Sequence, residues 1–130
     1  EHIIRASQES IVYQSNDLLL AMQRDCNTQL AELNVDGGAS RDAFLMQFQA
    51  DISGCPIRRP VIRETTALGA AYLAGLAVGV WRDQDELKQL WRCDTVFQPE
   101  MDDATRKVKL HGWDKAVGRS LHWMEPEKES

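Results

Sequence analysis

The chain has 130 residues and a formal net charge of −5 at pH 7, with 43% hydrophobic and 27% charged residues. This length is enough for one domain that buries about two-thirds of the surface of its unfolded chain. The acidic balance argues against a nucleic-acid-binding protein, which usually has a basic face. It does not exclude an anionic small ligand, because backbone dipoles can bind phosphate whatever the net charge of the protein.

The cysteine and hydropathy patterns both indicate a cytoplasmic protein. The three cysteines, Cys26, Cys55 and Cys93, are widely spaced and include no CxxC pair, so they fit neither a disulfide framework nor a zinc site. The longest apolar run, residues 67–80, is too short to span a bilayer, and no signal-peptide pattern is present. We therefore expect reduced thiols, a cytoplasmic location and no membrane span.

Apolar residues at helical spacing predict a first helix that runs to about Asp25. The residues that recur with this spacing are Ile3, Ile4, Ile11, Val12, Leu18, Leu19 and Met22. The pattern begins directly after His2 and has no capping residue before it. We therefore expect the natural protein to begin upstream of this helix.

A strand, a glycine turn and a second helix follow. Residues 30–35 predict a strand, and Gly37-Gly38 turns the chain. Residues 40–52 have apolar side chains at helical spacing, with Ser40 as the candidate N-cap. An Asp-Gly pair also occurs in two-residue hairpins, but the helical spacing after it favours a strand-to-helix turn.

Residues 56–61 (PIRRPV) predict a short second strand at a sheet edge, because prolines bound it. Strand, helix and strand make one βαβ unit, whose strands should be parallel and whose crossover should be right-handed. Two strands are too few for a stable sheet. We therefore expect the remaining strands to come from another part of the protein.

The second half of the chain is predicted to be helix-rich. Residues 65–79 form a helix with many small side chains, which indicates close packing against a neighbour. Residues 83–86 resemble a capping box that starts a short helix, and residues 94–99 predict a short extended stretch. A last helix begins at about Asp103, where the acidic pair with Asp102 suits the helix dipole.

No catalytic or metal-binding constellation stands out among the polar and aromatic residues. The sequences of a P-loop and of a GxGxxG motif are absent. The histidines lie apart and lack the spacing of known metal motifs: they are His2, His111 and His122. The tryptophans are expected to be packing anchors: they are Trp81, Trp91, Trp113 and Trp123. The arginines at 58, 59 and 63 predict a solvated rim, with an anion contact as the alternative.

The run Asp36-Gly37-Gly38 is the strongest candidate for a ligand contact. A strand that passes through glycines into a helix leaves backbone N–H groups facing a crevice. Phosphates and ribose hydroxyls can approach such backbone closely, because glycine has no Cβ. Gly-Gly turns are also common for purely structural reasons, so on these residues alone a structural turn remains the alternative.

Three stretches of the sequence resemble the FGGY family of carbohydrate kinases. Residues 35–81, VDGGASRDAFLMQFQADISGCPIRRPVIRETTALGAAYLAGLAVGVW, are similar to its C-terminal domain. Within them FLMQFQADI and ETTALGAAYLAGLAVG are closer to glycerol kinases than to xylulose or gluconate kinases. Residues 2–10 (HIIRASQES) resemble the end of a family signature, although Gln8 stands where the family prefers an apolar residue. Residues 112–123 (GWDKAVGRSLHW) resemble the last family helix.

The resemblance implies an α/β fold, part of an actin-like, ribonuclease H-like ATPase domain that is helix-rich with a few parallel strands. Residues 1–130 would be the adenosine-binding side of the C-terminal domain, without that domain's first strands and without the whole N-terminal domain. The implied activity of the full-length enzyme is transfer of the ATP γ-phosphate to glycerol, giving glycerol 3-phosphate. Another FGGY sugar kinase, or a non-catalytic actin-like nucleotide-binding module, is the alternative.

The resemblance also implies where the cofactors and partners bind. ATP or ADP and glycerol would bind in the full-length enzyme, a homo-oligomer, and the catalytic Asp and the Mg²⁺ ligands would lie upstream of this chain. No catalytic residue and no metal ligand is therefore expected here, and the isolated chain should be inactive. Some bacterial members hold a zinc ion partly through a Glu near the start of the last helix, but Thr105 occupies the matching position.

The resemblance places Gly37, Gly38 and Asp42 at the nucleotide. Gly38 matches the family glycine whose backbone lies against it. Asp42 stands where glycerol kinases usually carry an Asn that contacts the nucleotide. An ionised Asp only accepts hydrogen bonds, whereas Asn also donates them. We therefore predict that Asp42→Asn tightens ATP binding.

Overall fold

The computed structural model describes residues 1–62, 65–90 and 92–121, so Arg63, Trp91, His122 and Trp123 lie outside the described residues. The elements in chain order are α1 (His2–Cys26), β1 (Leu33–Asn34), the 3-10 helix η1 (Gly38–Arg41), α2 (Ala43–Ser53), β2 (Ile57–Pro60), α3 (Thr65–Ala77), α4 (Gln84–Leu90), β3 (Cys93–Phe97) and α5 (Asp103–Ser120). They fall into two compact units, Glu1–Glu100 and Met101–Ser130.

The described strands form one sheet in the order β1-β2-β3. β1 pairs with β2 in parallel, with Leu33 opposite Ile57, which confirms the predicted parallel pair. β3 pairs antiparallel to β2 on its other side, so the prediction that β2 is an edge strand is wrong. Pro60 is tolerated in this central strand because it is the last residue, beside a register shift after Arg59.

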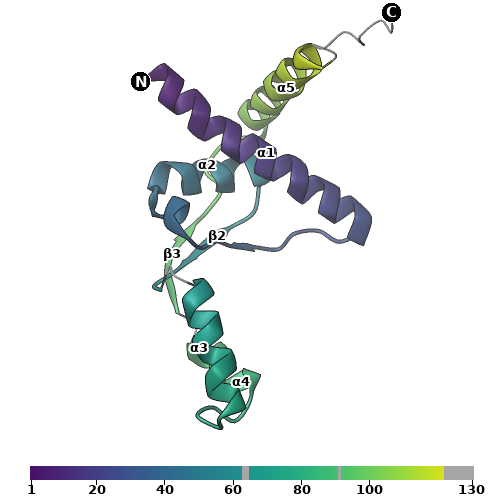
Figure 1. Cartoon of the computed structure of the whole chain (residues 1–130). Coiled ribbons are helices and arrows are strands. Elements are labelled where there is room, and N and C mark those ends of the chain that lie inside the picture. Colours follow the sequence, from purple (N-terminus) through teal and green to yellow (C-terminus); the bar gives the residue numbers. More distant parts are fainter. Residues whose placement is uncertain (63–64, 91, 122–130) are drawn as a thin grey trace, which may run out of the picture. The chain divides into compact units, whose positions relative to one another are not determined.

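The core of the first unit lies where α2 packs against α1 and against the sheet (Figure 1). The buried apolar residues are Val12, Tyr13, Leu45, Met46, Phe48, Ala50, Ile52, Cys55 and Ile57. Tyr13 meets Phe48 edge to face, with 5.6 Å between ring centroids. Burial of the Tyr13 phenol raises its pKa, and the carboxylate of Glu9 adds to this rise.

The first helix is present as predicted, but few of the apolar residues that predicted it are buried. Val12, Tyr13 and Asn16 are the buried residues of α1. The exposed large apolar residues of this helix are Ile3, Ile4, Ile11, Leu18, Leu20 and Met22. Within the described part of the chain, α1 therefore buries one narrow face and leaves a broad apolar face exposed.

The small-residue helix α3 ends in a turn that brings Trp81 back onto it. Gly79 has a φ of 77°, the amide of Val80 donates to the Gly75 carbonyl at 2.8 Å, and the Gly79 amide donates to Leu76. A Cβ on Gly75 would overlap the Trp81 ring. Close packing is thus confirmed at Gly75, although its partner is Trp81 and not another helix.

Acidic side chains cap the two remaining helices. The amide of Glu86 donates to Asp83 at 2.9 Å, and the Glu86 carboxylate accepts from the amide of Arg82. The start of α4 therefore differs from a full capping box only in which amide donates to the Glu86 carboxylate: it is that of Arg82 and not that of the cap residue Asp83. In the second unit Asp102 caps α5 and accepts from the amide and the hydroxyl of Thr105.

Of the described helices, none combines the length and apolarity needed to cross a bilayer.

Candidate functional site

The candidate site is the turn between β1 and α2, and its shape depends first on Gly37. This residue has a φ of 75° and a ψ of −175°. Only glycine adopts this conformation without strain, because it has no Cβ. The chain then makes one turn of 3-10 helix, Gly38–Arg41, before α2 begins. The predicted strand, glycine turn and helix are therefore present, with an extra turn between the glycines and α2.

Gly38 differs from Gly37 because neither backbone strain nor packing requires a glycine at this position. Its φ is not positive, and a Cβ placed on it would meet no atom of the described residues within 4 Å. Gly38 and Ala39 are both exposed. Within the described residues, no protein acceptor is recorded for either of their amides. The surface at Gly38 is therefore bare backbone with room for a ligand.

Ser40 closes this turn from the inside. It is 1% exposed, and its hydroxyl donates to the Gly37 carbonyl at 2.7 Å. Its amide donates to the same carbonyl at 3.3 Å. The prediction that Ser40 caps the helix is therefore wrong, because the inserted 3-10 turn moves the N-cap of α2 two residues further along the chain, from Ser40 to Asp42.

Asp42 is the N-cap of α2 and uses both carboxylate oxygens inside the protein. Oδ1 accepts from the amides of Phe44 and Leu45 at 2.9 and 3.1 Å. Oδ2 accepts from the side-chain amide of Gln8 on α1. The structure thus places Asp42 one 3-10 turn away from Gly38 and gives it a capping role that the sequence analysis missed.

Asp36, the third residue of the sequence candidate, links the turn to the start of α3. Its Oδ2 accepts from the hydroxyl of Thr65. The pattern Asp-Gly-Gly therefore contains three different roles: a side-chain link at Asp36, a required backbone conformation at Gly37 and an open backbone surface at Gly38.

The two described members of the predicted basic cluster are each paired with a carboxylate. Arg58 contacts Glu32 at 3.0 Å, and a third of its side chain is exposed. This agrees with the predicted solvated rim. Arg59 contacts Asp94 at 2.9 Å and its side chain is only 13% exposed. The structure therefore gives Arg59 internal partners, which sequence spacing could not identify because Asp94 lies 35 residues away.

The described residues include no group of three or more His, Cys, Asp or Glu side chains that could hold a metal ion. The three cysteines are free thiols. Backbone amides are groups that the described part of this site offers to an anionic ligand.

Comparisons with known proteins agree on one family. Residues 1–78 match the C-terminal domain of the FGGY family of carbohydrate kinases. The chain is 58% identical over 125 residues to a glycerol kinase of Alkaliphilus oremlandii, covering 96% of this chain and 25% of that protein. It therefore spans about a quarter of the length of the curated relatives it matches.

Solved structures give the same answer for the fold. A glycerol kinase of Plasmodium falciparum, determined with ADP, matches 95% of this chain and 25% of its own, with a TM-score of 0.83 and 41% identity. A ligand-bound xylulose kinase of Lactobacillus acidophilus matches 93% of this chain and 24% of its own, with a TM-score of 0.74 and 27% identity. The helix-rich α/β arrangement is thus that of these sugar kinases, with β3 as an antiparallel addition to the predicted parallel strands. The chain belongs to the FGGY family of carbohydrate kinases.

Proposed function

We propose that this chain is part of an ATP-dependent glycerol kinase and forms one wall of its adenosine pocket, at Gly37 and Gly38. The observation that carries the proposal is the open backbone at Gly38. A glycine that neither its own conformation nor its neighbours require is explained if a ligand lies where a Cβ would point. Similarity to a relative solved with ADP supports a nucleotide as that ligand.

The proposed reaction is transfer of the ATP γ-phosphate to a terminal hydroxyl of glycerol. Identity of 58% to a glycerol kinase, against 27% to a xylulose kinase, supports glycerol as the acceptor. A carboxylate upstream of this chain would act as general base toward the hydroxyl. The ATP of this proposed reaction would act with Mg²⁺, and the ligands of that ion would lie upstream of this chain.

We also propose that residues 1–130 are an incomplete C-terminal domain. The large apolar residues exposed on α1 and the match to a quarter of each relative support this proposal, since additional chain would cover such a surface. The isolated chain should then melt with poor cooperativity when followed by circular dichroism. A sharp two-state melt would contradict the proposal. A cytoplasmic homo-oligomer is part of the same proposal, and light scattering of the full-length protein tests the oligomeric state.

The test of function is an assay of the full-length protein with ATP and, separately, glycerol, xylulose and gluconate. We expect glycerol 3-phosphate as the product. We expect Gly38→Ala to raise the KM for ATP about tenfold, because a methyl group in van der Waals range of the ligand costs about 1–3 kcal/mol when it overpacks the site. Phosphorylation of another substrate would identify another FGGY kinase, and nucleotide binding without phosphorylation of any of them would identify a non-catalytic module.

A further inference from the structure

Arg59 lies in the central strand of the sheet and reaches both the neighbouring strand and the glycine turn. It is the third residue of β2, which pairs with β1 on one side and β3 on the other. Its side chain is 13% exposed. The sequence pattern predicts a solvated rim here, with an anion contact as the alternative, and it does not indicate any of the contacts that Arg59 makes.

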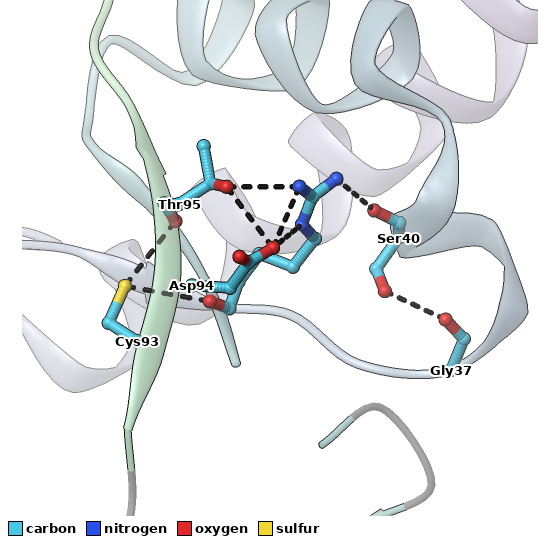
Figure 2. Close-up of polar contacts among 6 residues, drawn as sticks. Gly37, Ser40, Cys93, Asp94 and Thr95 are labelled. Carbon is cyan, nitrogen blue, oxygen red and sulfur yellow. Dashed lines mark hydrogen bonds and ion pairs between the residues drawn. The ribbon is translucent and has the colours of Figure 1, made fainter. Parts of the chain in front are cut away.

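The guanidinium of Arg59 uses all three of its nitrogens. Nε and Nη2 donate to Oδ2 of Asp94 at 3.1 and 2.9 Å, and Nη2 also donates to the Thr95 hydroxyl at 3.0 Å. Nη1 donates to the backbone carbonyl of Ser40 at 3.3 Å. Figure 2 shows Asp94, Thr95 and Ser40 around this group. Asp94 and Thr95 of β3 thus fix the orientation of the guanidinium, and its remaining nitrogen, Nη1, bonds to the glycine turn.

Hydrogen bonds within the turn connect Ser40 to the first of the two glycines. The hydroxyl of Ser40 donates to the Gly37 carbonyl at 2.7 Å (Figure 2). The amide of Ser40 donates to the same carbonyl at 3.3 Å. Gly38 and Ala39 lie between these two residues. The position of the Ser40 carbonyl therefore limits how the peptide planes of Gly38 and Ala39 can turn, and with them the direction in which their amides point.

We propose that Arg59 is a positioning residue for the nucleotide, acting through Ser40 on the amides of Gly38 and Ala39. This inference rests on the proposed function, because the nucleotide is the ligand that these amides would meet. The role requires a planar guanidinium, because the side chain must donate to Asp94 and to the Ser40 carbonyl at the same time. A lysine ammonium is a single point of charge and can satisfy only one of them in this geometry.

The test uses the full-length protein with Arg59→Gln, Arg59→Lys and, as matched control, Arg58→Gln. Arg58 is the preceding residue of the same strand and pairs with Glu32 at the surface. Calorimetry with ADP, the KM values for ATP and glycerol, and amide hydrogen exchange of residues 37–42 without nucleotide are compared. We expect Arg59→Gln to weaken ADP binding and raise the KM for ATP about tenfold, as loss of one charge-assisted bond would. The KM for glycerol should change less than about twofold, within the error of such comparisons.

Exchange of the turn amides should become faster in Arg59→Gln, Arg59→Lys should restore neither property, and Arg58→Gln should leave both unchanged. If Arg59→Gln does not fold, Asp94→Asn replaces it: this variant keeps an acceptor but loses the charge that orients the fork, and a smaller change in the same direction is expected. Unchanged ADP affinity, or equal effects on the KM values for ATP and glycerol, would overturn the positioning role while leaving the proposed function intact. Absence of nucleotide binding by the unsubstituted protein would overturn both.

Discussion

The side-chain amide of Gln8 donates a hydrogen bond to Oδ2 of Asp42, and so connects α1 to the N-cap of α2 across 34 residues of sequence. The family resemblance implies a departure from the family pattern at both positions, with a polar residue at 8 and an acid at 42. The two departures meet in one contact. Each is therefore best tested together with the other.

Replacement of Asp42 should separate its capping role from its charge. Asp42→Ala removes the acceptor of the Phe44 and Leu45 amides and should cost about 1 kcal/mol of unfolding free energy. Asp42→Asn keeps that acceptor, and the Gln8 amide can turn over so that its oxygen accepts from the new side chain. Denaturant unfolding of the full-length protein measures the difference. Equal losses in the two variants would contradict the capping role.

The charge of Asp42 is expected to weaken nucleotide binding. Asp42→Asn removes a negative charge one 3-10 turn from Gly38 and should lower the dissociation constant for ATP in calorimetry. Gln8→Leu is the control, because it removes the partner of Oδ2 and retains the charge; it should bring no gain in affinity. An unchanged or higher dissociation constant for Asp42→Asn would refute this prediction.

The two glycines of the turn should respond in opposite ways to alanine. Gly37→Ala must adopt a φ of 75° and should lose about 1–3 kcal/mol of stability. The methyl group of Gly38→Ala would meet no atom of the described residues within 4 Å, and alanine is the better helix former, so stability should be unchanged or slightly higher. Thermal melting of both variants, beside ADP binding by Gly38→Ala, makes the comparison. A large loss of stability in Gly38→Ala would show that glycine there has a structural reason.

Gly75→Ala should destabilise α3 even though alanine is the better helix former. The new methyl would overlap the ring of Trp81, which also meets Tyr72 edge to face at 5.3 Å between centroids. In the background of Trp81→Ala the same change should stabilise the helix, by up to about 1 kcal/mol. A double-mutant cycle in denaturant unfolding detects this change of sign. Additive effects would exclude the packing explanation.

The stabilisation of α5 by its N-cap, Asp102, should be lost at low pH. The backbone amide of Thr105, and then its hydroxyl, hold the pKa of Asp102 below its ordinary value. The stabilisation is therefore complete above the ordinary carboxyl pKa of 3.8 and is lost as the pH falls through the lowered pKa. Thr105→Val should raise the pKa part of the way, and Thr105→Ser should keep it low. Carboxyl carbon NMR titration follows both variants, and a Thr105→Val pKa equal to that of the unsubstituted protein would contradict the hydroxyl's contribution.

Much of the fold follows from local pattern. Helical spacing predicts α1 and α2, and the strand expected before Gly37 is the parallel partner of β2. The sequence pattern places the cap of α2 at Ser40. Residue type does not distinguish Ser40 from Asp42, because serine and aspartate are both good capping residues. Which of them caps depends on the 3-10 helix Gly38–Arg41, which includes Ser40. This helix begins after Gly37, whose backbone conformation sequence spacing does not encode.

The central place of β2 and the contacts of Arg59 could be found only from the three-dimensional structure. Residues 94–99 were predicted only as an extended stretch, and a single extended stretch does not indicate its pairing partner. Once β3 pairs with β2, Asp94 and Thr95 lie beside Arg59. The sequence does offer one indication, an arginine pair within a short strand that is otherwise apolar, but a solvated surface explains such a pair equally well.

The turn at residues 37–40 presents no ionisable group of its own. Gly37 and Gly38 have no side chains, Ala39 offers a methyl group, and the hydroxyl of Ser40 faces inward to the Gly37 carbonyl. Whatever binds there meets peptide dipoles, whose strength does not change as the solution becomes acidic or basic. The contribution of this turn to the affinity for an anion should therefore stay constant between mildly acidic and mildly alkaline conditions. Any pH dependence of binding must arise from neighbouring side chains or from the ligand itself.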